Sequence, residues 1–176
     1  MAITNWQILH REQVFKKYSR TIDRIDYKLP NGAEADFYIK AEGPSVATLA
    51  LTEHDEVILA RQFRPGPNAI LNELPGGFID PGEDALTAAK REFLEETGYT
   101  GDFVFIGTCL DDAYSTMQRH CFVATNCKKV SEIQSTTTEH TELILMPFAE
   151  FRQHIKTGQM TDIEVAYLAL DHLNRL

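Results

Sequence analysis

The stretch ELPGGFIDPGEDALTAAKREFLEETGY, which runs from Glu73 to Tyr99, decides how the rest of the chain is interpreted. Its second half predicts one amphipathic helix, because apolar residues recur there at helical spacing. Pro81-Gly82 predicts the turn before this helix, and Gly98 suits the left-handed position just after it. The apolar positions are Ala85, Leu86, Ala88, Ala89 and Phe93.

The polar face of this predicted helix carries glutamates where a helix built for stability would carry cations. Glu92 and Glu96 are four residues apart with Glu95 between them, and like charges at such spacing repel by roughly 0.2–0.5 kcal/mol per pair. The helix dipole also disfavours anions in the last turns. A hard divalent cation would complete the group, since Mg²⁺ and Mn²⁺ prefer carboxylate oxygens. For these residues taken alone, the alternative is an acidic, solvent-exposed helix face.

The residues around these glutamates follow a longer pattern with fixed spacing. Its positions, in chain order, are Gly77, Glu83, Arg91, Glu92, Phe93, Glu95, Glu96, Gly98 and Tyr99. This stretch resembles the Nudix box, and the nine constrained positions of the box all agree within twenty-three residues. The resemblance implies a hydrolase of nucleoside diphosphates that are linked to another group.

Length and composition predict an ordinary globular protein. The chain has 176 residues, 43% of them hydrophobic and 24% charged, which predicts one domain with a small elaboration. A net charge of −9 argues against nucleic acid or an anionic membrane as the main partner. No apolar run approaches ~20 residues, and residues 1–12 lack the apolar core of a signal peptide. Cys109, Cys121 and Cys127 lack metal-site spacing and predict free, packed thiols in a reducing, cytoplasmic location.

The chain on either side of the box predicts a β-rich protein with two further helices. Residues 6–17 are interrupted by charges and give no clear prediction. The order of elements fits an α/β/α sandwich around a mixed sheet, which is the architecture of the Nudix fold. Residues 1–42 predict an N-terminal antiparallel β extension, and residues 43–176 the Nudix hydrolase domain. Strands are predicted over 21–29, 35–40, 45–51, 56–63, 71–74, 103–109, 120–125 and 143–146, and helices over 148–157 and 161–176.

The resemblance implies a metal site at the box. Glu92 and Glu96 are expected to bind the metal directly, and Glu95 to share the metal cluster or an adjacent water. A backbone carbonyl of Gly76 or Gly77 is expected to complete the coordination, because a glycine loop can approach a metal closely. The expected cofactor is Mg²⁺, with Mn²⁺ as the alternative.

The resemblance also implies roles for a supporting ion pair and a general base. Arg91 is expected to hold the box carboxylates, with Glu83 as its partner, and an ordinary helix salt bridge is the alternative. Enzymes that cleave nucleoside-diphosphate sugars take a further carboxylate from a loop before a late strand, and Glu139 stands at that position. It is the first candidate for the general base or a third metal ligand, followed by Glu95 and Glu142. A solvated loop glutamate is the alternative.

Segments near the box resemble the ADP-ribose pyrophosphatase branch of the family. ELPGG from Glu73 resembles its lead-in, and RQFR from Arg61 to Arg64 resembles a strand whose last arginine helps to bind substrate. A strand-end arginine beside a glycine loop suits bidentate contact with phosphate. Arg64 is therefore the candidate phosphate clamp, with a plain surface arginine as the alternative. Arg61 and Glu73 are further substrate-binding candidates, and Tyr114 is a candidate for stacking on a base or for a core or rim position.

The predicted function is metal-dependent cleavage of the diphosphate of a nucleoside-diphosphate sugar by water. ADP-ribose is favoured, giving AMP and ribose 5-phosphate; GDP-sugars, dinucleoside polyphosphates and modified nucleoside triphosphates are alternatives. Asp112-Ala113 stands where the branch often has Pro-Gly, so it bears on this choice. A non-catalytic nucleotide-sensing Nudix domain is the alternative of another class, although such sensors usually lose box carboxylates. Members of the branch usually dimerise through their N-terminal strands, which predicts a homodimer.

Overall fold

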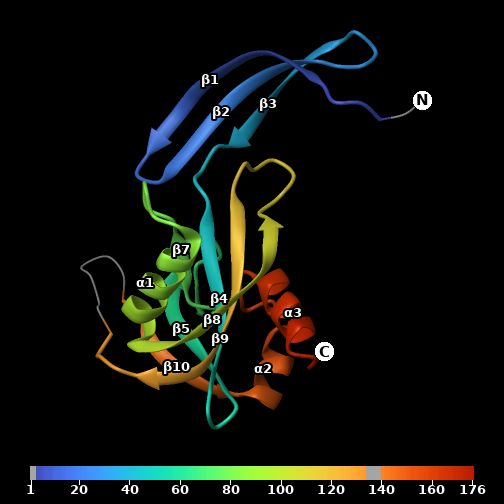
Figure 1. Cartoon of the computed structure of the whole chain (residues 1–176). Helices are drawn as coiled ribbons and strands as arrows, with labels where there is room; N and C mark the ends of the chain where they lie inside the picture. Colours follow the sequence, from blue (N-terminus) through green and yellow to red (C-terminus); the bar gives the residue numbers. More distant parts are fainter. Residues whose placement is uncertain (1–2, 134–139) are drawn as a thin grey trace. The chain divides into compact units, whose positions relative to one another are not determined.

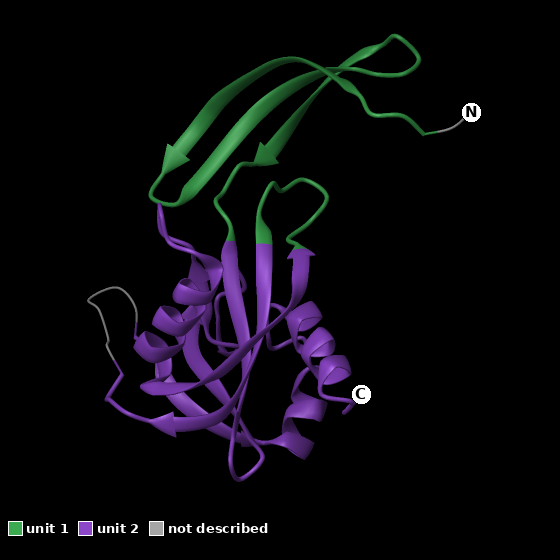
Figure 2. Cartoon of the chain, in the orientation of Figure 1, with its two compact units in different colours: residues 1–44, 110–118 green, residues 45–109, 119–176 purple. Residues whose placement is uncertain are grey.

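The computed structural model describes residues 3–133 and 140–176, and the chain divides into two compact units (Figure 2). The first unit comprises residues 1–44 and 110–118, and the second comprises residues 45–109 and 119–176. The first unit thus takes in a returning segment that the predicted boundary after residue 42 did not include. The predicted domain roles stay predictions.

A mixed sheet forms the centre of the second unit (Figure 1). Within the described residues it has seven strands, with the order β10-β5-β4-β9-β8, while β6 pairs with β5 and β7 pairs with β4. Strands β4 and β9 run parallel, whereas β5 is antiparallel to β4, β6 and β10. The strands are β4 (Ser45–Thr52), β5 (Glu56–Arg64), β6 (Ala69–Glu73), β7 (Gly76–Phe78), β8 (Tyr99–Leu110), β9 (Gln118–Lys129) and β10 (Glu142–Pro147).

Helices cover both faces of this sheet (Figure 1). Helix α1 (Ala85–Thr97) packs on one face, and α2 (Phe148–His154) and α3 (Ile163–His172) pack on the other. The alternation of side chains along β4 explains the two layers. Ala50 packs in a cluster with Phe93 of α1, whereas Leu49 packs in a cluster with Ala169 and Leu170 of α3. The predicted α/β/α sandwich around a mixed sheet is confirmed.

Helix α1 is the predicted box helix, and its ends explain its limits. The Asp84 side chain accepts hydrogen bonds from the backbone N–H groups of Leu86 and Thr87 at 2.9 and 3.0 Å, which satisfies two donors of the first turn. Gly98 ends the helix with a φ of 74°, as predicted. Ala88, Ala89 and Phe93 are buried against the sheet.

The glycine loop of the box, residues 74–77, includes the first two residues of β7 and lies where strands β4 and β5 diverge. These two strands pair at Ala50–Ile58 and Leu51–Val57. Further along, β5 pairs with β6 and β4 pairs with β7. The loop that joins β6 to β7 therefore enters the split, and the Pro75 carbonyl accepts a hydrogen bond from the Thr48 N–H at 3.0 Å. This places the loop within the sheet rather than on its surface.

The first unit is a three-stranded antiparallel sheet of β1 (Gln7–Lys17), β2 (Arg20–Lys28) and β3 (Glu34–Lys40) within the described residues. Strands β2 and β3 were predicted, as was their turn, where Gly32 has a φ of 85°. Strand β1 was not predicted. All its residues are exposed, so no alternation of buried and exposed positions leaves a period in the sequence.

All three cysteines lie on strands β8 and β9. Cys109, Cys121 and Cys127 are free. The Sγ atoms of Cys109 and Cys121 are 3.6 Å apart, and burial raises the pKa of the Cys121 thiol to about 12.

In the part of the chain that the structure describes, helices long and apolar enough to cross a membrane are absent.

Replacing Gly76 with alanine tests the close packing of the loop in the split. A Cβ at this position would lie 2.2 Å from the Val46 carbonyl oxygen, which is backbone and cannot rotate away. We expect a loss of roughly 2 kcal/mol or more in the free energy of unfolding, measured by urea denaturation. G66A is the matched control, because nothing lies within 4 Å of a Cβ there. Equal stability of the two variants would contradict the packing.

Candidate functional site

One guanidinium, that of Arg91, contacts most of the acidic side chains of the box. Its Nε and Nη2 donate to the two carboxylate oxygens of Glu83 at 3.0 and 2.9 Å. Its Nη1 donates to Glu92 at 2.8 Å and to Glu95 at 3.4 Å, and Nη2 also donates to the Phe78 carbonyl at 3.1 Å. The hydrogen bonds from Arg91 hold the pKa of Glu83 below its ordinary value. The predicted Arg91–Glu83 ion pair is therefore present, and the same guanidinium also contacts Glu92 and Glu95.

The remaining box carboxylate, that of Glu96, lies at the glycine loop. The Gly76 N–H donates to it at 2.9 Å, and the Gln62 side-chain amide contacts it at 3.5 Å. Glu92 reaches the same loop, because a Cβ on Gly77 would lie 2.5 Å from a Glu92 carboxylate oxygen. Burial raises the pKa of Glu96 to about 7, and the nearby charge of Glu92 acts in the same direction. Two carboxylates thus meet where glycine leaves room for them.

The donor set at the loop suits a hard divalent cation. Among the described residues, no group of three His, Cys, Asp or Glu side chains is placed to hold a metal ion. Magnesium, however, usually takes one or two carboxylates and fills its other positions with water and substrate phosphates. Glu92 and Glu96 supply that number at the loop. Glu92 and Glu95 both accept from Arg91, at 2.8 and 3.4 Å, so a place for Glu95 at the metal stays a prediction. Glu139, the predicted loop carboxylate, lies outside the described residues. The Gly76 group at Glu96 is its N–H, so a role for its carbonyl stays a prediction.

Arg64, the predicted phosphate clamp, is held by a fully buried carboxylate. Its Nε donates to Glu73, whose exposed fraction is 0%, and the Thr161 hydroxyl donates to the other oxygen of Glu73. The charge of Arg64 lowers the pKa of Glu96, in opposition to the larger effect of burial, so the guanidinium is near that one box carboxylate. Glu73 has both oxygens engaged inside the protein, which is the geometry of a residue that positions Arg64. Sequence reasoning missed Thr161, which lies 88 residues from Glu73 and carries no local signal.

Arg61, the other predicted substrate-binding arginine, lies on the opposite face of β5 from Gln62 and Arg64. Side chains alternate along a strand, and positions 61 and 64 differ by an odd number. Arg61 forms an ion pair of 3.8 Å with Glu142, which stands directly across from it on β10. Its role in substrate binding stays a prediction that this geometry does not support. Glu142, the third candidate for the base, has a side chain that is 73% exposed.

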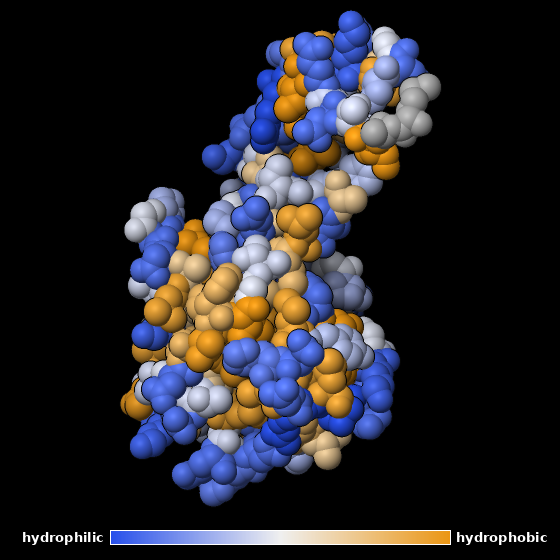
Figure 3. Space-filling model, turned by 45° about the vertical axis from the view of Figure 1, so that its right-hand side comes forward, coloured by the Kyte–Doolittle hydropathy of each residue, from blue (hydrophilic) through white to orange (hydrophobic). Residues whose placement is uncertain are grey.

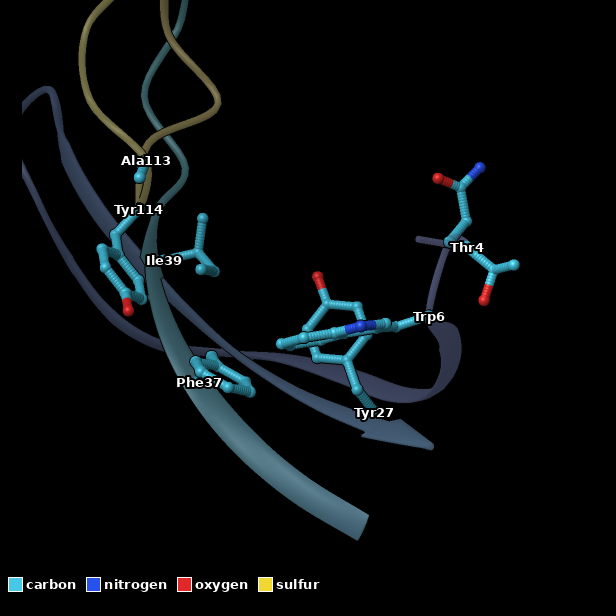
Figure 4. A pocket seen from close by; sticks show the side chains of 8 residues that line it. Thr4, Trp6, Tyr27, Phe37, Ile39, Ala113 and Tyr114 are labelled. Carbon is cyan, nitrogen blue, oxygen red and sulfur yellow. The ribbon is translucent and has the colours of Figure 1, made fainter. Parts of the chain in front are cut away.

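Tyr114 lines an aromatic pocket of the first unit (Figure 4). Its ring stacks on Phe37 with centroids 6.3 Å apart, and its N–H donates to the Asp112 side chain at 2.6 Å. Asp112, which stands where Pro-Gly was expected to begin, is paired with Lys40 at 2.6 Å. This ion pair fixes the start of the segment that carries Tyr114. The pocket has a volume of about 400 Å³ and is lined by Thr4, Asn5, Trp6, Tyr27, Phe37, Ile39, Ala113 and Tyr114.

Comparison with known proteins assigns the family. The model of the NUDIX domain matches residues 41–166. The methanol dehydrogenase activator of Bacillus methanolicus is 29% identical over 166 residues, which cover 90% of each chain. The ADP-ribose pyrophosphatase of Saccharomyces cerevisiae is 37% identical over 95 residues, which cover 47% of this chain but 41% of the yeast protein. A crystal structure of an ADP compounds hydrolase superposes with a TM-score of 0.81 over 100% of both chains, at 20% identity.

The chain belongs to the Nudix family. Its domain match extends well beyond the box and takes in α1, α2 and the first turn of α3. The predicted family, the fold class and the enzyme class, a Nudix hydrolase, are confirmed. The roles of individual site residues stay predictions.

Replacing Glu96 with glutamine tests the raised pKa, because glutamine keeps an acceptor for the Gly76 N–H but cannot ionise. In metal-free protein, the folded state holds the Glu96 proton up to about pH 7, whereas the ordinary pKa is 4.5. Wild-type stability should therefore fall relative to E96Q as pH rises through this window. We expect a relative change on the order of 2 kcal/mol, measured by urea unfolding in EDTA.

Magnesium provides the complementary measurement. Added at pH 8, it should stabilise wild type more than E96Q, because a ligand that binds the folded state raises its stability. Parallel pH profiles of the two proteins in EDTA would contradict the raised pKa. Equal stabilisation by magnesium would contradict the metal site.

Proposed function

We propose that this Nudix hydrolase is a metal-dependent pyrophosphohydrolase of nucleoside-diphosphate sugars, with ADP-ribose as the favoured substrate. The carrying observation is the meeting of Glu92 and Glu96 at the glycine loop, with the charge of Arg64 acting on Glu96. This arrangement combines carboxylates for a hard cation with an arginine for phosphate. The substrate class is supported by the names of relatives, which include ADP-ribose pyrophosphatases, and by the RQFR and ELPGG segments.

Each site residue has a part in this proposal. Glu92 and Glu96 would hold Mg²⁺, or Mn²⁺, which when bound neutralises charge that develops on the diphosphate. Arg64 binds a phosphate and keeps the diphosphate in position for attack. Arg91 fixes Glu92 and, with Glu83, joins the carboxylates to the β7 backbone. A glutamate removes a proton from the attacking water as the bond between phosphorus and the bridging oxygen breaks.

The identity of that base stays open among three carboxylates. Glu139 remains the first candidate by resemblance, although it lies outside the described residues. Glu95 stands on the box helix with a side chain that is 42% exposed, and its contact with Arg91 at 3.4 Å is long. Glu142 is more exposed, at 73%, and it faces Arg61. We therefore rank the candidates for the base as Glu139, Glu95 and Glu142. Replacing each in turn with glutamine and measuring kcat against pH shows which one removes the proton.

Tyr114 stays our candidate for stacking on a nucleobase. Tyr114, Phe37 and Trp6 offer flat apolar surfaces (Figure 4), and a nucleobase gains roughly 1–3 kcal/mol by stacking on an aromatic ring. A Y114A variant is expected to raise KM more than it lowers kcat.

We further propose a homodimer formed through β1. This strand is an edge of its sheet and every residue in it is exposed, and proteins usually protect such edges. Apolar side chains reach the surface of the first unit in the view of Figure 3. Those of β1 include Ile8, Leu9, Val14 and Phe15, with exposed fractions of 42–54%. A second copy of the chain would cover them.

A small substrate panel tests the proposed activity. It contains ADP-ribose, GDP-mannose, a diadenosine polyphosphate, NADH and an oxidised nucleoside triphosphate, each with Mg²⁺, and chromatography resolves the products. We expect metal-dependent release of AMP from ADP-ribose, and a loss of roughly a hundredfold or more in E96Q. K90Q, an exposed change on the same helix, is the control for folding and charge.

Other results of the panel would redirect the proposal. Preference for another substrate would keep the mechanism and change the specificity. Full activity of E96Q would exclude the metal site proposed here.

A separate assay adds the wild-type protein to a methanol dehydrogenase, because the activator of that enzyme is similar over 90% of its length. Stimulation by wild type but not by E96Q would identify hydrolysis as the basis of such an effect.

Light scattering tests the dimer. The chain has a mass of 19.9 kDa, and we expect a species of twice that mass. Replacing Phe15 with glutamate should shift the protein to the monomer, because a charge would be buried in the interface. V104E, at an equally exposed apolar position of β8, is the matched control and should not change the mass. A wild-type monomer at all concentrations would exclude the dimer.

A further inference from the structure

The carboxylate of Glu73 connects two segments that are far apart in the sequence. It lies at the end of β6 with an exposed fraction of 0%. One oxygen accepts from Arg64 Nε at the end of β5, and the other accepts from the hydroxyl of Thr161, just before α3. A carboxylate removed from water costs several kcal/mol unless donors inside the protein satisfy it. Arg64 and Thr161 are donors of this kind.

This arrangement limits the movement of Arg64. A guanidinium is planar, so fixing Nε also fixes the plane in which the other nitrogens lie. The Arg64 side chain is 38% exposed although its carboxylate partner is fully buried. It is therefore anchored on the interior side while part of it reaches solvent. The orientation of this arginine depends on the orientation of Glu73.

The segment that carries Thr161 is itself firmly held. Asp162, the next residue, begins α3 in the left-handed conformation, with a φ of 55°. Arg119 forms ion pairs with Asp162 at 3.1 Å and with Glu164 at 2.7 Å. The backbone carbonyl of Asp162 accepts from the first turn of the helix, at 3.1 Å from Val165 N. A non-glycine residue in this conformation persists where its surroundings determine it, so the Thr161 hydroxyl has a defined direction.

We propose that Thr161 is a positioning residue for substrate binding, which holds Glu73 so that Glu73 orients Arg64 toward the diphosphate. This inference rests on the proposed function, in which Arg64 binds phosphate. It makes the segment before α3 part of the binding apparatus. Without the hydroxyl, one oxygen of the buried Glu73 lacks its donor, and the side chain turns to recover one. Arg64 then loses its fixed orientation.

The variants T161V and T161S separate the hydroxyl from the shape of the side chain. Valine is isosteric with threonine but cannot donate, whereas serine keeps the donor. We expect T161V to raise KM for ADP-ribose roughly tenfold with kcat changed less than about threefold, and T161S to remain near wild type. T157V is the matched control in the same segment, because the Thr157 hydroxyl donates to the His154 carbonyl and not to Glu73. Calorimetric binding of ADP-ribose in EDTA gives a readout without turnover.

A double-mutant cycle with R64Q shows whether the effect passes through Arg64. We expect T161V to weaken binding in the wild-type background but to add little in R64Q, because the arginine it orients is then gone. An equal effect of T161V in both backgrounds, or failure of T161S to restore KM, would overturn the inference. Thermal unfolding checks that each variant folds, and T161A replaces T161V in the cycle if T161V does not.

The same experiment separates this inference from the proposed function. If R64Q raises KM while T161V has no effect, Arg64 binds substrate without the help of Thr161 and the inference is wrong. If R64Q leaves KM unchanged, Arg64 is not the phosphate clamp, and that part of the proposed function is wrong together with the inference.

Discussion

The site depends on the sharing of one guanidinium among several carboxylates of the box. Glu83, Glu92 and Glu95 all accept from Arg91, which offsets repulsion that acidic groups on one helix face would otherwise suffer. Arg91 also donates to the Phe78 carbonyl, so it joins α1 to β7 and the glycine loop. A lysine could not do this, because it lacks the fork that serves several acceptors in a fixed geometry. The positions of the helix, the loop and the carboxylates are therefore coupled through one side chain.

The two glycines of the loop are required for different reasons. Gly76 lies so close to β4 that a Cβ would meet the Val46 carbonyl oxygen, and Gly77 lies so close to Glu92 that a Cβ would meet its carboxylate. The first contact sets the loop into the split of the sheet, and the second brings the Glu92 carboxylate against it. The Gly76 N–H then reaches Glu96. Because neither glycine has a Cβ, the same short loop can contact both strand β4 and helix α1.

The sequence predicted those features whose signals are local. Helix α1 has a clear period and recognisable ends, and the buried strands β4 and β5 have continuous apolar runs. Strand β1 was missed because all its residues are exposed, and β7 because three residues, two of them glycine, carry no pattern. Resemblance proposed Arg61 and Arg64 together, yet alternation places them on opposite faces of β5. The contact of Thr161 with Glu73 follows from the tertiary fold and has no counterpart in the sequence pattern.

Glu73 and Glu96, two carboxylates near the loop, differ in how the surrounding residues satisfy them. Glu73 is fully buried, and its oxygens accept from Arg64 and Thr161, so its charge is compensated within the protein. Glu96 receives one backbone N–H and a long contact from Gln62. Burial, together with the nearby charge of Glu92, nevertheless raises its pKa to about 7. It also stands near the end of α1, where the helix dipole disfavours an anion. The fold thus satisfies Glu73 with its own donors, whereas Glu96 keeps a raised pKa, and groups with a shifted pKa cluster at functional sites.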